Sequence, residues 1–208
     1  MPLQYIFGYG SLMQIASRTR TVPSAFAASP AIVKGISRGW YYQDEGPGLS
    51  PTYLGAVADV SATTNGVIYG VTDAELAATD AREADYVRLP IDGSAITTLD
   101  GGPVPSDAKF WYYASKEKKP VNDKHPIVQS YVDICVDGCL EIEAMYPLAR
   151  EAHFAERFIE TCTDWGTPWI NDRIFPYRPF IYMPRASKID ELLSKFLPGG
   201  LFHKIVVG

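Results

Sequence analysis

The chain has 208 residues, of which 47% are hydrophobic and 21% charged, and its formal net charge is -5. These proportions are typical of a globular protein with one large domain, or one domain and an appendage, and they exclude a disordered or fibrous chain. The acidic balance and the lack of a long Lys/Arg run argue against a nucleic-acid or lipid partner.

The N-terminus and the cysteines bear on location. Residues 1–5 lack the basic region and long apolar stretch of a secretory signal, and no apolar run is long enough to span a bilayer. Three cysteines, Cys135, Cys139 and Cys162, are odd in number and lie in sequence typical of helices, so we expect reduced thiols rather than a disulfide framework. The sequence therefore predicts a cytoplasmic protein.

Strand-like segments dominate the first half of the chain. Aromatic and β-branched runs predict the strands, and clusters of Gly, Pro, Asn and Asp predict the turns. A polar turn at 61–65 is expected to separate two strands, and Thr72 or Asp73 is expected to cap a helix over 74–80. The predicted strands span residues 3–9, 31–42, 53–60, 66–72, 86–91, 96–99 and 108–114.

Helical periodicity takes over after residue 120. Apolar residues between 126 and 143 recur at helical spacing, which predicts an amphipathic helix. Further helices are expected over 147–162, which begins with a proline, and over 188–196. The sum is an α+β fold with one mostly antiparallel sheet or small barrel and helices appended to it.

Two groups of residues could carry chemistry, and the first is FGYGSL at residues 7–12. A strand that ends in Gly-Ser and turns at once leaves several backbone N–H groups pointing the same way. Such a nest can hold a carboxylate or phosphate, with help from the Ser11 hydroxyl. Gly10 would allow a positive φ and close approach of a ligand. The alternative is a strand-to-loop turn whose glycines serve only the backbone.

The second group is DAREADYVR at residues 80–88, at a predicted helix end. One carboxylate that faces the sheet, with a pKa raised by burial, could act as a general acid/base near neutral pH. The alternative is a solvated helix end whose charges pair with one another. The residues alone do not choose among Asp80, Glu83 and Asp85.

Four segments, in matching order and near the right separations, resemble the gamma-glutamylcyclotransferase-like superfamily over roughly residues 3–140. That grouping includes enzymes specific for glutathione, for γ-glutamyl amino acids and for γ-glutamylamines. The segments are YGSL at 9–12, GVIYGV at 66–71, the D-x-x-E-x-x-Y-x-R pattern of Asp80, Glu83, Tyr86 and Arg88, and the helix that carries Tyr131 and Gly138.

The resemblance implies a reaction and a site. A γ-glutamyl amide is converted to 5-oxoproline and a free amine by attack of the substrate's own α-amine, so no protein nucleophile, metal or organic cofactor is required. The expected partner is a small-molecule γ-glutamyl substrate. The resemblance assigns general acid/base catalysis to Glu83 and substrate binding to Tyr9, Gly10, Ser11, Leu12 and Tyr131.

The resemblance also implies the domain organisation. Residues 1–145 would form the gamma-glutamylcyclotransferase-like catalytic domain, a small mixed, mostly antiparallel β-barrel with flanking helices. Residues 146–208 would form a helical and aromatic extension packed on the same domain. The Trp- and Arg-rich segment 163–180 lies outside the common superfamily core. It could pack the last helices onto the barrel, form a lid over the site, or make a homodimer contact.

Other hypotheses remain open at this point. A non-catalytic protein could use the same pocket to sense γ-glutamyl or acidic metabolites, and a structural protein could use segment 163–180 as its contact surface. A zinc site of Cys135, Cys139 and His153 is conceivable, although core or surface positions are expected for these residues. The sequence leaves open the leaving group and the oligomeric state.

Overall fold

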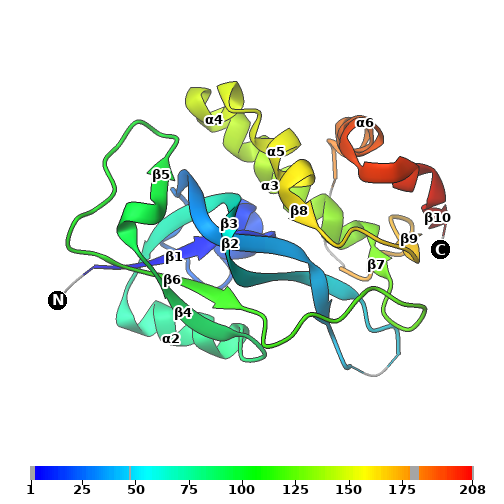
Figure 1. The fold of residues 1–208 in the computed structure, drawn as a ribbon, viewed down its shortest axis with the longest axis horizontal. Coiled ribbons are helices and arrows are strands. Elements are labelled where there is room, and N and C mark those ends of the chain that lie inside the picture. The colour runs from blue at the N-terminus through cyan, green and yellow to red at the C-terminus, as the bar shows by residue number, and fades with distance from the viewer. Residues whose placement is uncertain (1–2, 47, 179–182, 208) are drawn as a thin grey trace.

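The computed structural model describes residues 3–46, 48–178 and 183–207. A mixed, mostly antiparallel sheet of seven strands curls into half a barrel, with helices around it (Figure 1). The predicted α+β class is therefore confirmed. Its strands are β1 (Gln4–Gly8), β2 (Ser29–Gln43), β3 (Thr52–Val71), β4 (Val87–Ile91), β5 (Ile96–Thr98), β6 (Lys109–Ala114) and β8 (Cys162–Thr163).

The strand order places β1 in the interior of this sheet. The order is β4-β6-β1-β3-β2-β5, and β8 pairs with β2. Strand β1 runs antiparallel to β3 and parallel to β6, and Ile6 and Phe7 are almost completely buried. Since β1 is covered on both edges, the chain that leaves it at Tyr9 emerges in the middle of the fold.

The predicted polar turn at 61–65 is wrong. Strand β3 continues through these residues, and both of its halves pair with β2. The register shifts between the pairs Lys34↔Thr63 and Ile36↔Ala58, so the extra residues of β3 form a bulge, and Val60 is fully exposed there. A bulge absorbs extra residues without reversing the strand, and the β-branched threonines that follow favour pairing.

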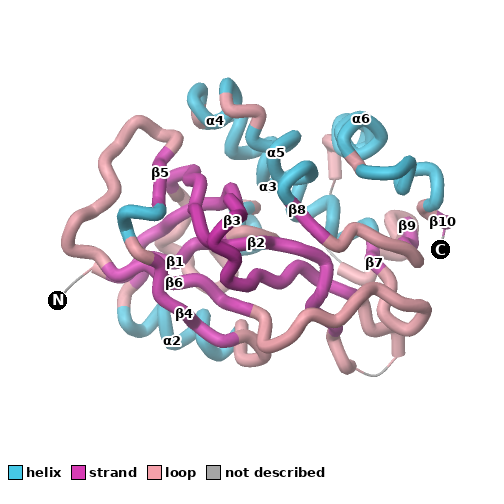
Figure 2. The backbone as a smooth tube through the Cα atoms, viewed as in Figure 1, coloured by secondary structure: helices cyan, strands magenta, loops and turns pink. Residues whose placement is uncertain are grey.

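The helices lie around the sheet, as the tube drawing shows (Figure 2). In that view α2 lies below the sheet, beside β4, and the later helices gather above it. The elements are α1 (Ile15–Arg18), α2 (Asp73–Arg82), α3 (Gln129–Met145), α4 (Pro147–Glu151), α5 (Phe154–Thr161) and α6 (Ala186–Phe196), with 3₁₀ turns η1 (Ser11–Met13), η2 (Gly93–Ala95) and η3 (Pro198–Lys204).

The single helix predicted over 147–162 is wrong, because two helices, α4 and α5, occupy this stretch. His153 between them adopts a left-handed conformation with φ 51°. The break redirects the chain so that one face of α5, including Phe154 and Phe158, is buried against the core. Tertiary burial therefore outweighs the local preference for one continuous helix.

The aperiodic stretch 164–184 contains a strand that the sequence did not reveal; its residues 179–182 lie outside the described chain. A three-stranded parallel sheet consists of β7 (Ile127–Val128), β9 (Trp169–Asn171) and β10 (Val206–Val207), with β9 in the middle. Trp169 is completely buried and stacks on Trp165, with ring centroids 5.4 Å apart. For these two tryptophans, the alternative that segment 163–180 packs onto the rest of the fold is correct.

None of the helices in the described ranges combines the length and the apolar character that crossing a membrane requires.

Gly138 lets α3 approach the loop that follows β1. A Cβ atom at this position would lie 2.6 Å from the Gln14 backbone nitrogen and 2.8 Å from the Met13 carbonyl carbon. We expect Gly138→Ala to lower the free energy of unfolding by about 1–3 kcal/mol through overpacking, despite the gain in helix propensity of about 1 kcal/mol. Urea denaturation measures the change.

Gly70→Ala is the matched control for this substitution. A Cβ atom at Gly70 would meet its nearest neighbour, the Tyr5 ring, at 3.6 Å, which is an ordinary contact. An equal effect of the two substitutions would contradict the close approach of α3 as the cause.

Candidate active site

A small pocket, the inner pocket, lies where β1 ends. Its volume is about 30 Å³, enough for one water molecule. All six residues that the resemblance assigns to the site line it: Tyr9, Gly10, Ser11, Leu12, Glu83 and Tyr131. The fold brings them together from the end of β1, the end of α2 and the first turn of α3. Sequence reasoning did not assign the other four lining residues to the site: Phe7, Leu54, Tyr86 and Tyr113.

The inner pocket opens into a second cavity of about 250 Å³, the middle cavity. The two share the lining residues Ser11, Glu83, Tyr86 and Tyr131. The middle cavity in turn adjoins a larger space of about 450 Å³, the outer pocket, with which it shares Tyr42, Asp44 and Asp85. The three together reach the volume usual for a small-molecule site.

The loop after β1 presents free backbone N–H groups. Residue 13 donates its N–H to the Gly10 carbonyl at 2.9 Å, which closes the η1 turn. Among the residues that the structure describes, the N–H groups of Gly10, Ser11 and Leu12 have no acceptor. Unpaired donors at the start of a helical turn favour an anionic ligand, so this loop can serve as a carboxylate site.

Gly10 does not adopt the positive φ expected from the sequence. Its φ is −130° and its ψ is −128°. The close approach of a ligand stays a prediction, and a Cβ atom here would lie 3.4 Å from the Tyr131 hydroxyl and 3.5 Å from Leu54. Glycine at this position therefore leaves room for the Tyr131 hydroxyl.

Two buried arginines, which sequence reasoning missed, hold the loop at both ends. The Arg38 guanidinium donates to the Tyr9 carbonyl at 3.0 Å and to the Asn65 carbonyl at 2.7 Å. Arg18 donates to the Met13 carbonyl at 2.6 Å, and its burial lowers the pKa of its guanidinium. Neither arginine forms an ion pair within the described part of the chain. Backbone carbonyls supply the partners of these charges, and no sequence motif marks them.

Glu83 follows directly after α2. A capping box of Thr72 and Glu75 fixes the start of this helix, which defines where its last turn places Glu83. The Glu83 carboxylate pairs with Arg82 Nε at 3.0 Å, and the side chain is only 18% exposed. Burial raises the pKa of Glu83, and Arg82 and Arg178 oppose this rise. The result is a carboxylate with more basic character than an exposed glutamate.

The competing carboxylates have other surroundings. Asp80 accepts a hydrogen bond from the Tyr113 hydroxyl at 2.9 Å and pairs with Arg88 at 3.2 Å, and it does not line the inner pocket. Asp85 is exposed and lines the middle cavity and the outer pocket. Of the three acids, only Glu83 lies in the inner pocket, as the family spacing predicts.

Four tyrosines surround Glu83, and three of their hydroxyls are occupied. Tyr9 donates to the Tyr113 carbonyl at 2.5 Å, Tyr86 to the Leu54 carbonyl at 3.0 Å, and Tyr113 to Asp80. The Tyr131 hydroxyl makes no such bond to any residue in the described ranges. Burial, aided by the nearby Glu83 charge, raises the pKa of Tyr131 well above its usual value. It therefore stays protonated and can donate to a ligand.

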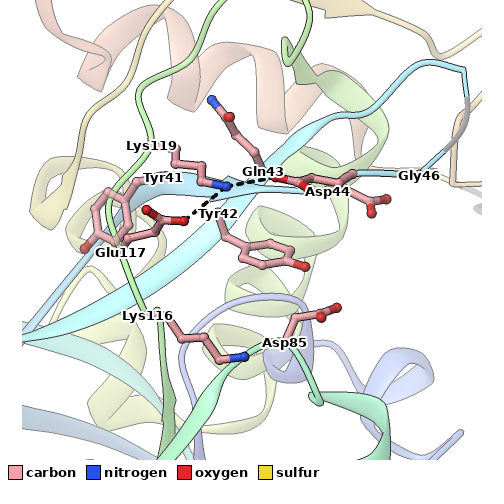
Figure 3. Close-up of a pocket in the computed structure, with 10 residues that line it drawn as sticks. Tyr41, Tyr42, Gln43, Asp44, Gly46, Asp85, Lys116, Glu117 and Lys119 are labelled. Carbon is pink, nitrogen blue, oxygen red and sulfur yellow. Dashed lines mark hydrogen bonds and ion pairs between the residues drawn. The ribbon is translucent and has the colours of Figure 1, made fainter.

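The outer pocket is lined by both acids and lysines. Lys119 pairs with Glu45 at 2.9 Å and with Glu117 at 3.1 Å. Figure 3 shows these pairs as dashed lines and shows the Tyr42 hydroxyl pointing toward the Asp85 carboxylate. Burial and the Asp85 charge raise the pKa of Tyr42. Asp44 and Asp85, the two acids that line both this pocket and the middle cavity, thus have no lysine partner within the described chain.

Other nucleophiles and metal ligands lie away from the pocket. All three cysteines are free and buried, and burial raises the pKa of Cys162 to about 12, so its thiol stays protonated. The side chain of His153 is 70% exposed, whereas Cys135 and Cys139 are completely buried. Within the described ranges, no three His, Cys, Asp or Glu side chains form a group that could hold a metal ion.

The described part of segment 163–180, residues 163–178, contributes one residue to the site. Arg178 lines the middle cavity, and its guanidinium lies over the Tyr53 ring at 4.6 Å and the Tyr131 ring at 5.6 Å. Arg173 of the same segment instead pairs with Asp133 of α3 at 2.7 Å and with Asp190 of α6 at 2.9 Å. The segment thus both packs α6 onto α3 and supplies a cation to the site; the homodimer contact stays a prediction.

The architecture defines a class of protein: a curled sheet whose central strand ends at a pocket with a buried glutamate. Three solved structures share this fold. A "Gamma-glutamyl cyclotransferase" matches with 14% identity and a TM-score of 0.55, over 93% of this chain and 99% of that one. An uncharacterized Homo sapiens protein, loc79017, matches with 14% identity and a TM-score of 0.56, over 80% and 93%.

YkqA from Bacillus subtilis, the third, matches with 20% identity and a TM-score of 0.50, over 74% of this chain and 54% of YkqA, so the chain spans about half of that protein. Among curated proteins none matches. The family is nevertheless defined, because the model of the family "Gamma-glutamyl cyclotransferase, AIG2-like" matches residues 6–131. The chain belongs to this family.

The raised pKa of Glu83 predicts how stability depends on pH. A carboxyl whose pKa is raised on folding favours the folded state below its unfolded pKa, and this contribution is lost as pH rises through the folded pKa. Glu83→Gln stays neutral throughout, and Arg82 keeps its hydrogen bond to the Ser17 carbonyl at 3.0 Å. We expect a higher Tm for this variant than for wild type near pH 8.

The gap in Tm should close below about pH 4, where the wild-type carboxyl is protonated in both states. Thermal melts across this range measure it, with the exposed Glu160→Gln as control. A gap that grows toward low pH would contradict the raised pKa.

Proposed function

We propose that this protein is an enzyme that converts a γ-glutamyl amide to 5-oxoproline and a free amine, with Glu83 as the general acid/base. One observation carries the proposal: a single pocket collects the largely buried Glu83 together with the N–H groups of the loop after β1 and the hydroxyl of Tyr131, and these donors have no hydrogen-bond acceptor within the described residues. The family membership of residues 6–131 agrees with it. The three free, buried cysteines agree with a cytoplasmic location.

The chemistry requires proton transfer rather than a protein nucleophile. The α-ammonium of the substrate loses a proton to Glu83, and the free amine attacks the γ-carbonyl carbon. A new C–N bond closes the five-membered ring, and the original amide C–N bond breaks. In sum the α-nitrogen gives up two protons and the departing amine gains two. Glu83 carries one of these two protons, which must reach the leaving nitrogen before the bond breaks. The second proton is exchanged through water.

The rest of the rate comes from positioning. Ring closure is intramolecular, so a fold that holds amine and carbonyl together supplies much of the acceleration. The N–H groups of Gly10, Ser11 and Leu12 would bind the α-carboxylate, and Tyr131 would donate a hydrogen bond near the reacting carbonyl. The inner pocket is too small for the whole γ-glutamyl group, so the substrate would extend into the middle cavity.

The test is release of 5-oxoproline from glutathione, a γ-glutamyl dipeptide and the γ-glutamylamine of lysine. We expect release from at least one of the three. Glu83→Gln should lower kcat about 10²- to 10⁴-fold, the usual contribution of a general base, while Glu160→Gln remains active. An unchanged rate in Glu83→Gln would sink the assignment of the base, and a loss in Asp85→Asn alone would move it to Asp85.

Binding of these substrates without release by the wild type would favour a sensor of γ-glutamyl metabolites. A buried carboxylate beside an anionic ligand speaks against that alternative, because it weakens binding unless it takes up a proton.

Tyr131→Phe tests the hydroxyl separately. The ring packs against Tyr53 and Trp40, with centroids 4.6 and 5.9 Å away, so phenylalanine preserves the packing. We expect an unchanged Tm and a loss in kcat of about tenfold, equivalent to one hydrogen bond made in the transition state. A wild-type kcat would place the hydroxyl outside the reaction.

A further inference from the structure

Arg178 lines the middle cavity and forms no ion pair with any described residue. The other arginine that lines the middle cavity, Arg82, already forms an ion pair with Glu83 and a hydrogen bond to the Ser17 carbonyl. No carboxylate in the described ranges lies within ion-pair distance of Arg178. Its guanidinium lies over two aromatic faces, those of Tyr53 and Tyr131, although the residue as a whole is exposed. A guanidinium placed in this way presents its N–H donors to a carboxylate.

The position of Arg178 relates it to the leaving group. Glu83 and Tyr131 line both the inner pocket and the middle cavity, so the reacting atoms belong at this junction. The γ-glutamyl group would enter the inner pocket, beside the loop after β1. Arg178 lines only the middle cavity, on the far side of the junction. It therefore faces the part of the substrate beyond the scissile amide.

The middle cavity and the outer pocket differ in the charges that line them. Asp44 and Asp85 line both the middle cavity and the outer pocket, whereas Arg178 does not line the outer pocket. Arg178 thus favours a negative group inside the middle cavity, whereas the outer pocket presents the two acids together with Lys116. In a γ-glutamyl α-amino acid the carboxylate is one carbon from the leaving nitrogen, and its side chain extends outward.

We propose that Arg178 is a specificity-determining residue that binds a carboxylate on the leaving group, next to the scissile amide. The inference rests on the proposed function and names its substrate class: γ-glutamyl α-amino acids are preferred over γ-glutamylamines that lack this carboxylate. The residue comes from the extension beyond the family-matched residues 6–131. The reaction and the choice of leaving group therefore have separate origins in the chain.

The test compares γ-glutamyl-alanine with γ-glutamyl-ethylamine, which differ only by the carboxylate. We expect wild type to prefer the first by about tenfold or more in kcat/KM, as for one charged hydrogen bond. Arg178→Gln should raise KM for γ-glutamyl-alanine by this factor and leave KM for γ-glutamyl-ethylamine unaffected, while any change in kcat that follows from the lost charge near Glu83 is shared by both substrates. Arg178→Lys should restore part of the preference, and the exposed Arg150→Gln on α4 is the control.

The outcomes separate the two proposals. Equal use of both substrates by wild type, or an equal loss of kcat/KM on both in Arg178→Gln, overturns the role of Arg178 and leaves the reaction standing. No release of 5-oxoproline from any γ-glutamyl substrate overturns the proposed function. Calorimetry with the same two compounds then still decides the inference: tighter binding of γ-glutamyl-alanine that is lost in Arg178→Gln supports it, and equal Kd values overturn it.

Discussion

The hydrogen bonds of one buried guanidinium, that of Arg38, hold the parts of the site together. It joins the Tyr9 carbonyl at the start of the loop to Asn65 of β3 and to two residues of α5, the Phe158 carbonyl at 2.9 Å and the Thr161 hydroxyl at 3.1 Å. A buried cation is costly unless its donors are satisfied. Backbone and side-chain oxygens accept from both terminal nitrogens, and the Phe158 ring lies 4.1 Å from the guanidinium, whereas Nε has no hydrogen-bond partner within the described residues. The sheet, the loop and the extension are thereby fixed relative to one another.

A loop whose carbonyls are bound from behind keeps its N–H groups toward the pocket. Arg38 and Arg18 take up carbonyls at its two ends, and Gly138 allows α3 to pack against its backbone. Donors held in this way need little reorganisation when a charged ligand arrives. The same burial that rigidifies the loop raises the pKa of Glu83, and the adjacent Arg82 keeps its ionised form accessible. Both properties of the site thus follow from one cause, the low exposure of the end of β1.

The sequence could predict the fold class and could single out six of the ten residues that line the inner pocket, because their signals are local. A strand that ends in YGSL and an acidic helix end are visible in short windows, and the resemblance supplied their relation. The features that were missed depend on tertiary partners. Residues 61–65 are polar enough for a turn, yet β2 pairs with them. His153 breaks a helix because α5 must turn its apolar face inward, and Arg38 carries no motif since its partners are mostly main-chain carbonyls.

The predicted extension, residues 146–208, bears on the site in two different ways. Through Phe158 and Thr161 it completes the coordination of Arg38, which is a structural contribution to the loop. Through Arg178 it adds a charge to the cavity beyond the scissile bond. In the proposed reaction the atoms that react need only the pocket of residues 6–131, whereas the leaving group meets a surface that the extension helps to build. Two members of the family with the same pocket and different extensions would therefore share the reaction and differ in the amine that they release.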